Sequence, residues 1–481
     1  MIVWGFLTVW IGMQISAISM AEICAAYPSA GSVYHWAAQV VPAEWAPFWS
    51  YVTGIFNFIG NTAGDASFAV GFAQLFNSAL QASGVTPYQE GAETVMVSLL
   101  TIIFWSILNF LRIDKIGWLQ IFAVYFQIAS IFVVCISILV MQQPLNDGKY
   151  VFGGYYNGTG LSDDTNASHG STNRIMLGFL GLQCGLFAFV GFEAPAHLAE
   201  ETTNSSENAP KGIIYTVLVS GLFGIFYYIC LLFACTNIDA VLSGVTDDDS
   251  IILTGYASTN IFILACGQKG GAGLTWLIVI NLFFAGLASV AVTGRICFAL
   301  MRDKLFPGST YFSQTTEGTA SPFAAISLVC VIDLFLQLLP LNVTNGNVAF
   351  NSIVALCNLG FYVSYALPVF LKLVYQPKDF PVTKMDLGRW SNPLAAITSI
   401  WLFGTSFIYF FPNWYPINVT THTETYDDGY TATVGSDMNW LIVVVAGVFI
   451  IFALNWIFSA RYHFRGPPRI GLTSSDVNVN A

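Results

Sequence analysis

The chain has 481 residues, of which 55% are hydrophobic and only 9% are charged, and its net charge is −11. Soluble domains carry roughly a quarter of their residues as charges, so this composition excludes an ordinary soluble protein. Long apolar blocks separated by short polar loops indicate a membrane protein, and the acidic balance excludes a basic nucleic-acid-binding surface.

Eleven apolar segments are long enough to cross a bilayer. A helical span needs about twenty apolar residues, because each residue adds about 1.5 Å against a hydrocarbon core of about 30 Å. The segments are continuous rather than alternating, which favours helices over strands. The predicted spans are 2–24, 48–80, 92–111, 117–141, 175–198, 213–235, 274–300, 323–339, 349–374, 394–411 and 440–459.

Basic residues recur in every second loop between these spans. Arg112 and Lys115 lie in one such loop, and Arg302 and Lys304 lie in another. The other basic loops and the tail contribute Lys211, Lys372, Lys378, Lys384, Arg389, Arg461, Arg465 and Arg469. Because short cytoplasmic loops carry an excess of Lys and Arg, these loops and the C-terminus are predicted to be cytoplasmic.

Sequons for N-glycosylation agree with this orientation. Asn157, Asn166, Asn342 and Asn418 fall in loops assigned to the outside, whereas Asn204 falls inside. Such patterns also occur by chance, but four on the same side favour a glycoprotein of the secretory pathway. We expect a multi-pass protein of the plasma membrane, with the vacuole or another endomembrane as the alternative.

The first span begins at the second residue of the chain and has no basic flank to orient it. An odd number of spans with a cytoplasmic C-terminus would place Met1 outside. A signal peptide would have a charged n-region and a shorter apolar stretch. We therefore expect a further helix upstream of Met1.

The fifth predicted span carries the features that point most strongly to chemistry. Gly191 and Pro195 lie within it, where Pro removes a backbone hydrogen bond and Gly relaxes the chain, and Glu193 lies between them. An ionisable residue within a span usually faces the bundle interior or water. Transporters place such interrupted helices at their substrate sites. The alternative is a proline kink packed against its neighbours.

Other polar residues within the spans allow two interpretations. Asn57, Asn61 and Asp65 recur at i, i+4 and i+8, so that one face of the second span is polar. This face could line a cavity, which we favour, or bond to neighbouring helices. Asp333 has no other acid in its span and is either a proton carrier or a hydrogen-bonded structural residue.

No cofactor, metal site or catalytic set is predicted. The nine cysteines form no CxxC pair, and no His cluster has metal-ligand spacing. Nucleophile elbows, HExxH and kinase motifs are missing from the sequence, so we do not expect an enzyme. The rings of charge or filter motif of a channel are not visible either.

Several motifs together resemble one family. Ser-Met-Ala-Glu-Ile-Cys at 19–24, the segment 27–38 and Met-Arg-Asp-Lys-Leu-Phe-Pro at 301–307 are similar to motifs of amino acid permeases. Further similarity lies at 187–193, 200–212, 349–351, 387–391 and 466–467. The chain thus resembles the amino acid–polyamine–organocation superfamily over nearly its whole length. Its GABA/choline permease branch is the most similar one.

The resemblance implies a fold as well as a function. The expected fold is an all-α membrane protein with a five-plus-five inverted repeat of the leucine-transporter type and two extra helices, the first helix being missing from these 481 residues. Residues 1–141 would form the rest of the first repeat and 175–374 the second. Residues 394–459 would form the extra helices, and 460–481 a cytoplasmic tail.

The family's substrate site includes the unwound centre of its sixth helix. By resemblance, Phe187, Ala188 and Val190 would offer backbone carbonyls to the substrate amine, and Phe187 would lie where relatives place an aromatic gate. Gly191 would permit the break, and Glu193 would be the helix's acid. The resemblance therefore implies secondary transport of a small amino acid or amine, such as GABA or another zwitterion, by alternating access.

Asn57 and Asn61 join this predicted substrate site as lining residues. The coupling cation, proton or sodium, stays open, and Glu193, Asp65 and Asp333 are the candidate residues for coupling. Two alternatives to a transporter remain: a non-transporting nutrient receptor on the same scaffold, or an inactive truncated isoform. The expected partners are a small-molecule substrate, the coupling cation and the lipid bilayer, without nucleic acid.

Overall fold

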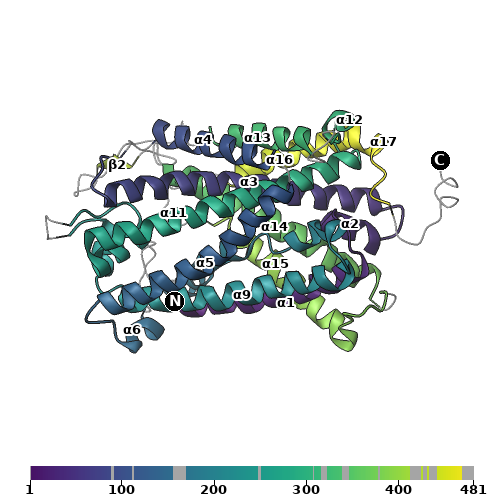
Figure 1. The fold of residues 1–481 in the computed structure, drawn as a ribbon. Helices are drawn as coiled ribbons and strands as arrows, with labels where there is room; N and C mark the ends of the chain where they lie inside the picture. The colour runs from purple at the N-terminus through teal and green to yellow at the C-terminus, as the bar shows by residue number, and fades with distance from the viewer. Residues whose placement is uncertain are drawn as a thin grey trace.

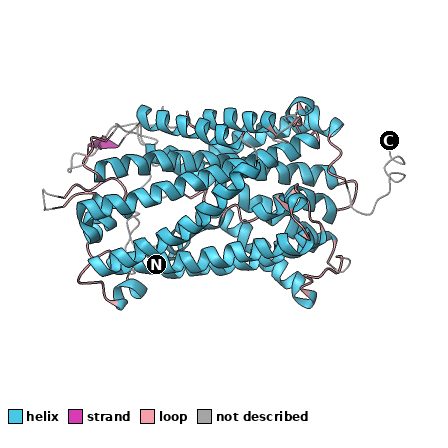
Figure 2. Cartoon of the chain, viewed as in Figure 1, coloured by secondary structure: helices cyan, strands magenta, loops and turns pink. Residues whose placement is uncertain are grey.

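The structure, a computed structural model, is described here for residues 2–87, 91–110, 113–154, 170–246, 251–306, 308–315, 322–338, 346–377, 380–411, 424–425, 431–432 and 441–468. Within these ranges nearly every regular element is a helix (Figure 2). The strands found there are β1 (Glu424–Thr425) and β2 (Thr431–Ala432), which form one short antiparallel pair. The predicted all-helical class is confirmed.

The long helices run lengthwise beside one another and coincide with the predicted spans (Figure 1). They are α1 (Ile2–Ala26), α3 (Ala46–Ala82), α4 (Ala92–Asn109), α5 (Ile113–Met141), α7 (Gly170–Leu186), α9 (Ser205–Ala234), α11 (Ala257–Arg302), α13 (Phe323–Leu336), α14 (Gly346–Tyr375), α15 (Ser391–Ile408) and α16 (Leu441–Asn455). Short helices join or extend them: α2 (Ser32–Val40), α6 (Gly148–Gly153), η1 (Phe187–Phe189), α8 (Ala194–His197), η2 (Ala199–Glu201), α10 (Ile238–Ser243), α12 (Ser309–Phe312), η4 (Gly388–Trp390), η5 (Trp456–Ala460) and α17 (Arg461–His463).

Length and apolarity separate these helices into two groups. Seven of the described helices are long and apolar enough to cross a membrane, and eight if the bent pair around η1 is one span. Helix α13 has only 14 residues, and α3 buries Asn57, Asn61 and Asp65. Each predicted span thus contains a helix in the described residues, but fewer of these helices meet the requirements for a span by length and composition.

Helix α11 begins much earlier than the predicted span 274–300. It starts at Ala257 and contains one non-helical residue, Gly267, with φ 72° and ψ 171°. Asn260 fixes the segment before this kink by donating to the carbonyls of Val241 and Thr254. The predicted boundary was wrong because the helical segment before the kink begins with polar residues, such as Thr259 and Asn260, that bond to other parts of the protein.

The helix pairings repeat when the two halves of the chain are exchanged. Helix α3 packs on α4 as α11 packs on α13, and α4 contacts α11 as α13 contacts α3. Helices α3 and α11 are antiparallel, because Asp65 bonds to Ser289 while Ser78, further along α3, bonds to the earlier Thr259. This exchange of partners is the pattern that an inverted repeat requires.

Aromatic rings lie over glycines where neighbouring helices meet. At four such contacts, a Cβ atom on the glycine would collide with the ring of the partner helix. The pairs are Gly12 with Trp401, Gly221 with Trp10, Gly224 with Phe6, and Gly286 with Trp105. Close van der Waals packing of this kind holds helices together in a bilayer, where the hydrophobic effect between helices is lost.

Helices α3 and α14 approach each other through a pair of glycines. A Cβ atom on Gly360 would lie 2.5 Å from the nitrogen of Gly60 and 2.8 Å from the carbonyl oxygen of Phe56. Only glycine permits this approach. It brings Asn57 of α3 and Tyr365 of α14 to the same place in the protein interior.

Candidate functional site

The helix that carries Glu193 is broken where the sequence predicted. Helix α7 ends at Leu186, and η1 continues it to Phe189. Val190 is extended, and Gly191 has a φ of +76° that favours glycine. Helix α8 then begins, with Pro195 in its first turn, where a missing N–H costs nothing. The two halves, Met176–Gln183 and Phe187–His197, are bent by 43°.

Glu193 lies directly after this break and is fully buried. Its Oε1 accepts a hydrogen bond of 3.1 Å from Nδ2 of Asn57, and its Oε2 accepts one from the hydroxyl of Tyr365. Asn57 Nδ2 also lies 3.5 Å from the hydroxyl of Ser364. The carboxylate therefore links three helices, α8, α3 and α14.

The Tyr365 hydroxyl forms hydrogen bonds with two residues, one within the break and one directly after it. It donates to Glu193 and accepts a hydrogen bond of 2.9 Å from the backbone N–H of Gly191. One turn earlier, the hydroxyl of Tyr362 donates to the carbonyl of Leu186 at 2.7 Å, just before the helix breaks. Two tyrosines of α14 thus satisfy backbone groups at both ends of the interruption.

His197 connects Glu193 to the loop before α2. Its Nδ1 lies 2.8 Å from the carbonyl oxygen of Ala30, so Nδ1 carries the proton of this hydrogen bond. Its Nε2 lies 3.9 Å from Oε1 of Glu193, too far for a hydrogen bond but close enough for an ion pair when the ring is charged. His197, which the sequence places at a helix end, faces the site.

A polar cluster lies at the same end of the molecule as Ala30. The Ala30 N–H donates to Glu200 at 3.2 Å, and Glu200 pairs with Arg302 at 3.5 Å. Next to Arg302, the carboxylate of Asp303 accepts a hydrogen bond of 2.9 Å from Tyr34. Burial raises the pKa of Asp303, against the opposing effects of the Tyr34 hydroxyl and the Arg302 guanidinium.

The predicted backbone ligands lie on the accessible side of the break. Ala188 is exposed, whereas Phe187, Val190 and Gly191 are partly exposed. A Cβ atom at Gly191 would meet no other atom within 4 Å, so open space borders the break. The structure thus places the buried Glu193 next to a partly exposed stretch of main chain, and a carboxylate with carbonyl oxygens suits a cationic group.

The polar face predicted on α3 divides among different partners. Asn57 reaches Glu193, as described above, and Asn61 donates to the carbonyl of Asn57 on its own helix at 2.8 Å. Asp65 accepts from Ser289 of α11, and both Asp65 and Asp333 are fully buried. Of this face, only Asn57 bonds to the acid at the helix break.

The tyrosines of α14 were missed by the reasoning from sequence. Tyr362 and Tyr365 lie three residues apart in an apolar span, so one helical face carries two hydroxyls. A buried tyrosine hydroxyl usually finds a hydrogen-bond partner, and this spacing was the available signal. Its partners could not be named, because they lie about 170 residues away in the sequence.

One basic residue lies elsewhere than predicted. Lys372 was assigned to a cytoplasmic loop, but it belongs to α14 and is 1% exposed. Its ammonium group pairs with Glu22 of α1 and lies 2.9 Å from the hydroxyl of Ser391. Lys372 therefore joins helices and does not contribute an exposed charge to a loop.

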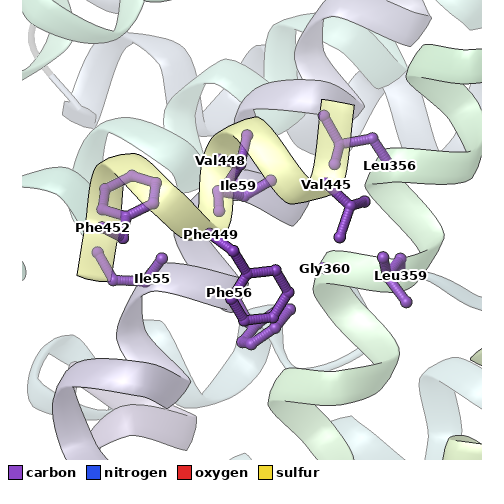
Figure 3. Close-up of a pocket in the computed structure, with 10 residues that line it drawn as sticks. All are labelled: Ile55, Phe56, Ile59, Leu356, Leu359, Gly360, Val445, Val448, Phe449 and Phe452. Carbon is purple, nitrogen blue, oxygen red and sulfur yellow. The ribbon is translucent and has the colours of Figure 1, made fainter. Parts of the chain in front are cut away.

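An apolar pocket lies between α3, α14 and α16, and Glu193 does not line it (Figure 3). Apolar side chains line it, together with the glycine at the crossing of α3 and α14. The lining residues are Ile55, Phe56, Ile59, Leu356, Leu359, Gly360, Val445, Val448, Phe449 and Phe452. These residues offer no polar side chain, so the pocket does not suit a charged solute.

The sequence predicted glycosylation at four loop asparagines. Asn157, Asn166, Asn342 and Asn418 lie outside the described residues. Their use therefore stays a prediction.

Comparison with known proteins places the chain among membrane permeases. Residues 1–449 match the sequence model of the family described as amino acid permease. The chain is 29% identical over 460 residues to the amino-acid permease BAT1 of Arabidopsis thaliana, covering 94% of this chain and 83% of that protein. It is 25% identical over 490 residues to an uncharacterized amino-acid permease of Schizosaccharomyces pombe, covering 99% and 79%. A solved manganese transporter of Eremococcus coleocola aligns with a TM-score of 0.40 at 12% identity, over 95% of this chain and 96% of that one.

Proposed function

Because this chain belongs to the amino acid permease family, we propose that it carries a small amino acid or amine across a membrane by alternating access. Such transport moves one group of helices against another around a substrate site and needs no covalent step. The proposed substrate is GABA or another small zwitterion, in keeping with the resemblance to the GABA/choline branch.

The observation that carries this proposal is the buried Glu193 behind an accessible helix break. The main chain at Phe187, Ala188 and Val190 would bind the substrate's ammonium group through carbonyl oxygens, as in the family. Glu193, three residues after Val190, adds a negative charge, which favours a cation nearby. The exposed fraction of these residues and the open space at Gly191 support access by a small solute.

The contacts of Glu193 also suggest how movement would be controlled. Asn57 and Tyr365 hold the acid from two different helices, α3 and α14. A rearrangement that turns the site from one side of the membrane to the other would have to change at least one of these bonds. We therefore propose two roles for Glu193. It contacts the substrate, and its hydrogen bonds to α3 and α14 hold these helices in place until the site turns to the other side of the membrane.

The membrane and the orientation belong to the same proposal. We place the chain in the plasma membrane, with the vacuole or another endomembrane as the alternative, and its C-terminus in the cytoplasm. The alternation of basic and acidic loops supports this orientation. Glycosidase treatment that shifts gel mobility through Asn157 or Asn166 would agree with it, and a shift mapped to Asn204 would overturn it.

An uptake assay tests the function directly. The full chain is reconstituted in liposomes and offered labelled GABA, neutral α-amino acids and choline, each alone. We expect uptake of at least one amino acid or amine, and a loss of roughly 10- to 100-fold in Glu193→Gln, since hydrogen bonds to a charged group contribute about 1.5–3 kcal/mol.

The matched control for this assay is Glu44→Gln, which neutralises an exposed glutamate before α3. It should leave uptake unchanged. Wild-type liposomes that carry none of the offered solutes would count against the substrate class. Equal uptake by wild type and Glu193→Gln would remove Glu193 from the site.

A further inference from the structure

A second pair of acids is buried away from Glu193. Asp65 of α3 and Asp333 of α13 are both 0% exposed, and their carboxylates act on each other electrostatically. One turn after Asp333, Nε2 of Gln337 donates a hydrogen bond of 3.0 Å to the carbonyl of Ala66. This bond joins α13 to α3 next to Asp65, so the two acids lie near the same contact between these helices.

Most oxygens of this acid pair have no hydrogen-bond donor. Both carboxylate oxygens of Asp333, Oδ2 of Asp65 and Oε1 of Gln337 are buried without a partner among the described residues. Oδ1 of Asp65 accepts a hydrogen bond from the hydroxyl of Ser289, and the Thr293 hydroxyl also acts on the Asp65 carboxylate. Buried polar groups are rarely left unpaired, so these oxygens point to a bound species.

The groups around the acid pair do not include a cation. The titratable side chains that interact with either carboxylate are thiols, one on each neighbouring helix: Cys297 of α11, Cys330 of α13 and Cys357 of α14. Glu193 also acts electrostatically on Cys357. In the part of the chain that the structure describes, no Lys, Arg or His offsets the charge of the acid pair.

Two ionised carboxylates cannot stay in such a place unaided. An isolated buried charge costs several kcal/mol even after relaxation, and like charges at one site prevent both acids from ionising together. A proton on one carboxyl removes one charge.

The two acids differ in which one is suited to hold the proton. Asp65 keeps a donor, the Ser289 hydroxyl, which stabilises a negative charge. Asp333 has no donor on either oxygen. We propose that Asp333 holds a proton while Asp65 stays ionised, so that the acid pair is a proton-binding site separate from the site at Glu193.

The proposed proton site shares helix α3 with the Glu193 site. Asp65 and Asn57 are eight residues apart on this helix, which corresponds to about 12 Å along its axis. Movement of α3 would therefore act on both sites. The proton site follows from burial and unpaired oxygens alone, so it does not depend on the proposed transport function.

Infrared difference spectroscopy can detect the proton itself. The full chain in lipid is titrated with acid and base, and the carbonyl stretch of protonated carboxyl groups is recorded in sodium chloride and in N-methylglucamine chloride. We expect a carboxyl band at neutral pH that is lost in Asp333→Asn. The band should remain in the control Asp239→Asn, which changes an exposed acid of α10.

A second variant keeps the test decisive if Asp333→Asn does not fold. Asp65→Asn removes the negative charge that acts on Asp333, so the Asp333 band should persist but shift in frequency. An unshifted band would overturn the assignment of the proton to this acid pair. A band that appears only when sodium is removed would also overturn the proposal, because the acid pair would then bind sodium and not a proton when sodium is present. Neither result requires any measurement of uptake.

Discussion

Replacing Gly360 by alanine should separate the two helices that hold Glu193. Gly360 lies where α14 crosses α3, and the added Cβ atom would lie 2.5 Å and 2.6 Å from the nitrogen and Cα of Gly60. Both are backbone atoms in the middle of a helix, so they cannot turn away as a flexible side chain would. Asn57 and Tyr365 lie about one turn from this crossing. We therefore expect their hydrogen bonds to Glu193 to weaken when the two helices separate.

The size of the effect follows from two opposing contributions. Overpacking a tight contact costs about 1–3 kcal/mol. Replacing a helical glycine by alanine gains about 0.5–1 kcal/mol, because the unfolded chain loses flexibility. The expected result is a net loss of up to about 2 kcal/mol of stability.

The thermal stability of the purified protein in detergent, followed by size-exclusion chromatography after heating, measures this loss. Gly64→Ala on the same helix pair is the matched control, because its Cβ would meet only side-chain atoms at ordinary contact distances, the Cys357 sulfur at 3.4 Å and Cε2 of Phe361 at 3.9 Å. Gly360→Ala should melt at a lower temperature than this control and take up less substrate. Equal melting of the two variants would refute the reasoning from the glycine crossing.

Three further substitutions should each change one measurable property. Tyr365→Phe removes a donor from buried Glu193, which costs about 1–3 kcal/mol, and initial rates of GABA uptake should fall. Lys372→Met leaves the buried Glu22 without the positive charge that balances it. The free energy of unfolding should fall by about 3–5 kcal/mol, and the melting temperature should fall with it. His35 is buried, and burial lowers its pKa from 6.5 to about 4. Between these values the unfolded chain binds a proton that the folded protein does not, so stability should fall by up to about 3 kcal/mol as pH drops from 6.5 to 4. This pH dependence should be smaller in His35→Asn, as thermal melting at several pH values would reveal.

Each of these predictions has its own contrary result. Unchanged uptake in Tyr365→Phe would show that transport does not need the two hydrogen bonds of the Tyr365 hydroxyl. For the buried ion pair, Lys384→Met is the control, because Lys384 pairs with Glu207 at an exposed site and such pairs contribute little. Equal losses in the two lysine variants would contradict the assigned role of burial. A His35→Asn protein with the same pH dependence as wild type would show that other groups cause it.

The local features of the site were predictable from the sequence, whereas its tertiary partners were not. Gly191 and Pro195 break a helix by their own backbone chemistry, so a window of a few residues was enough to locate the break. Tyr365 reaches Glu193 only because two glycines let α14 cross α3 closely. That contact depends on the packing of distant segments, which hydropathy does not encode.

The same distinction explains which parts of the fold were predicted. Apolar length located the helices, because lipid contact and helix formation coincide in most of them. The prediction was wrong where they separate, as in the polar start of α11 at Ala257 and in Lys372, whose charge is buried against Glu22. In both places the polar groups are satisfied by protein, which a scale of transfer to lipid cannot register.

The aromatic rings seated on glycines have a consequence for how this sequence can change over time. At each contact, such as Trp10 on Gly221 or Trp105 on Gly286, the ring occupies the space that a side chain on the glycine would need. A larger residue at the glycine is then tolerated only together with a smaller one at the ring. Such positions should covary in relatives of this chain, each pair conserving its summed volume while neither residue is conserved alone.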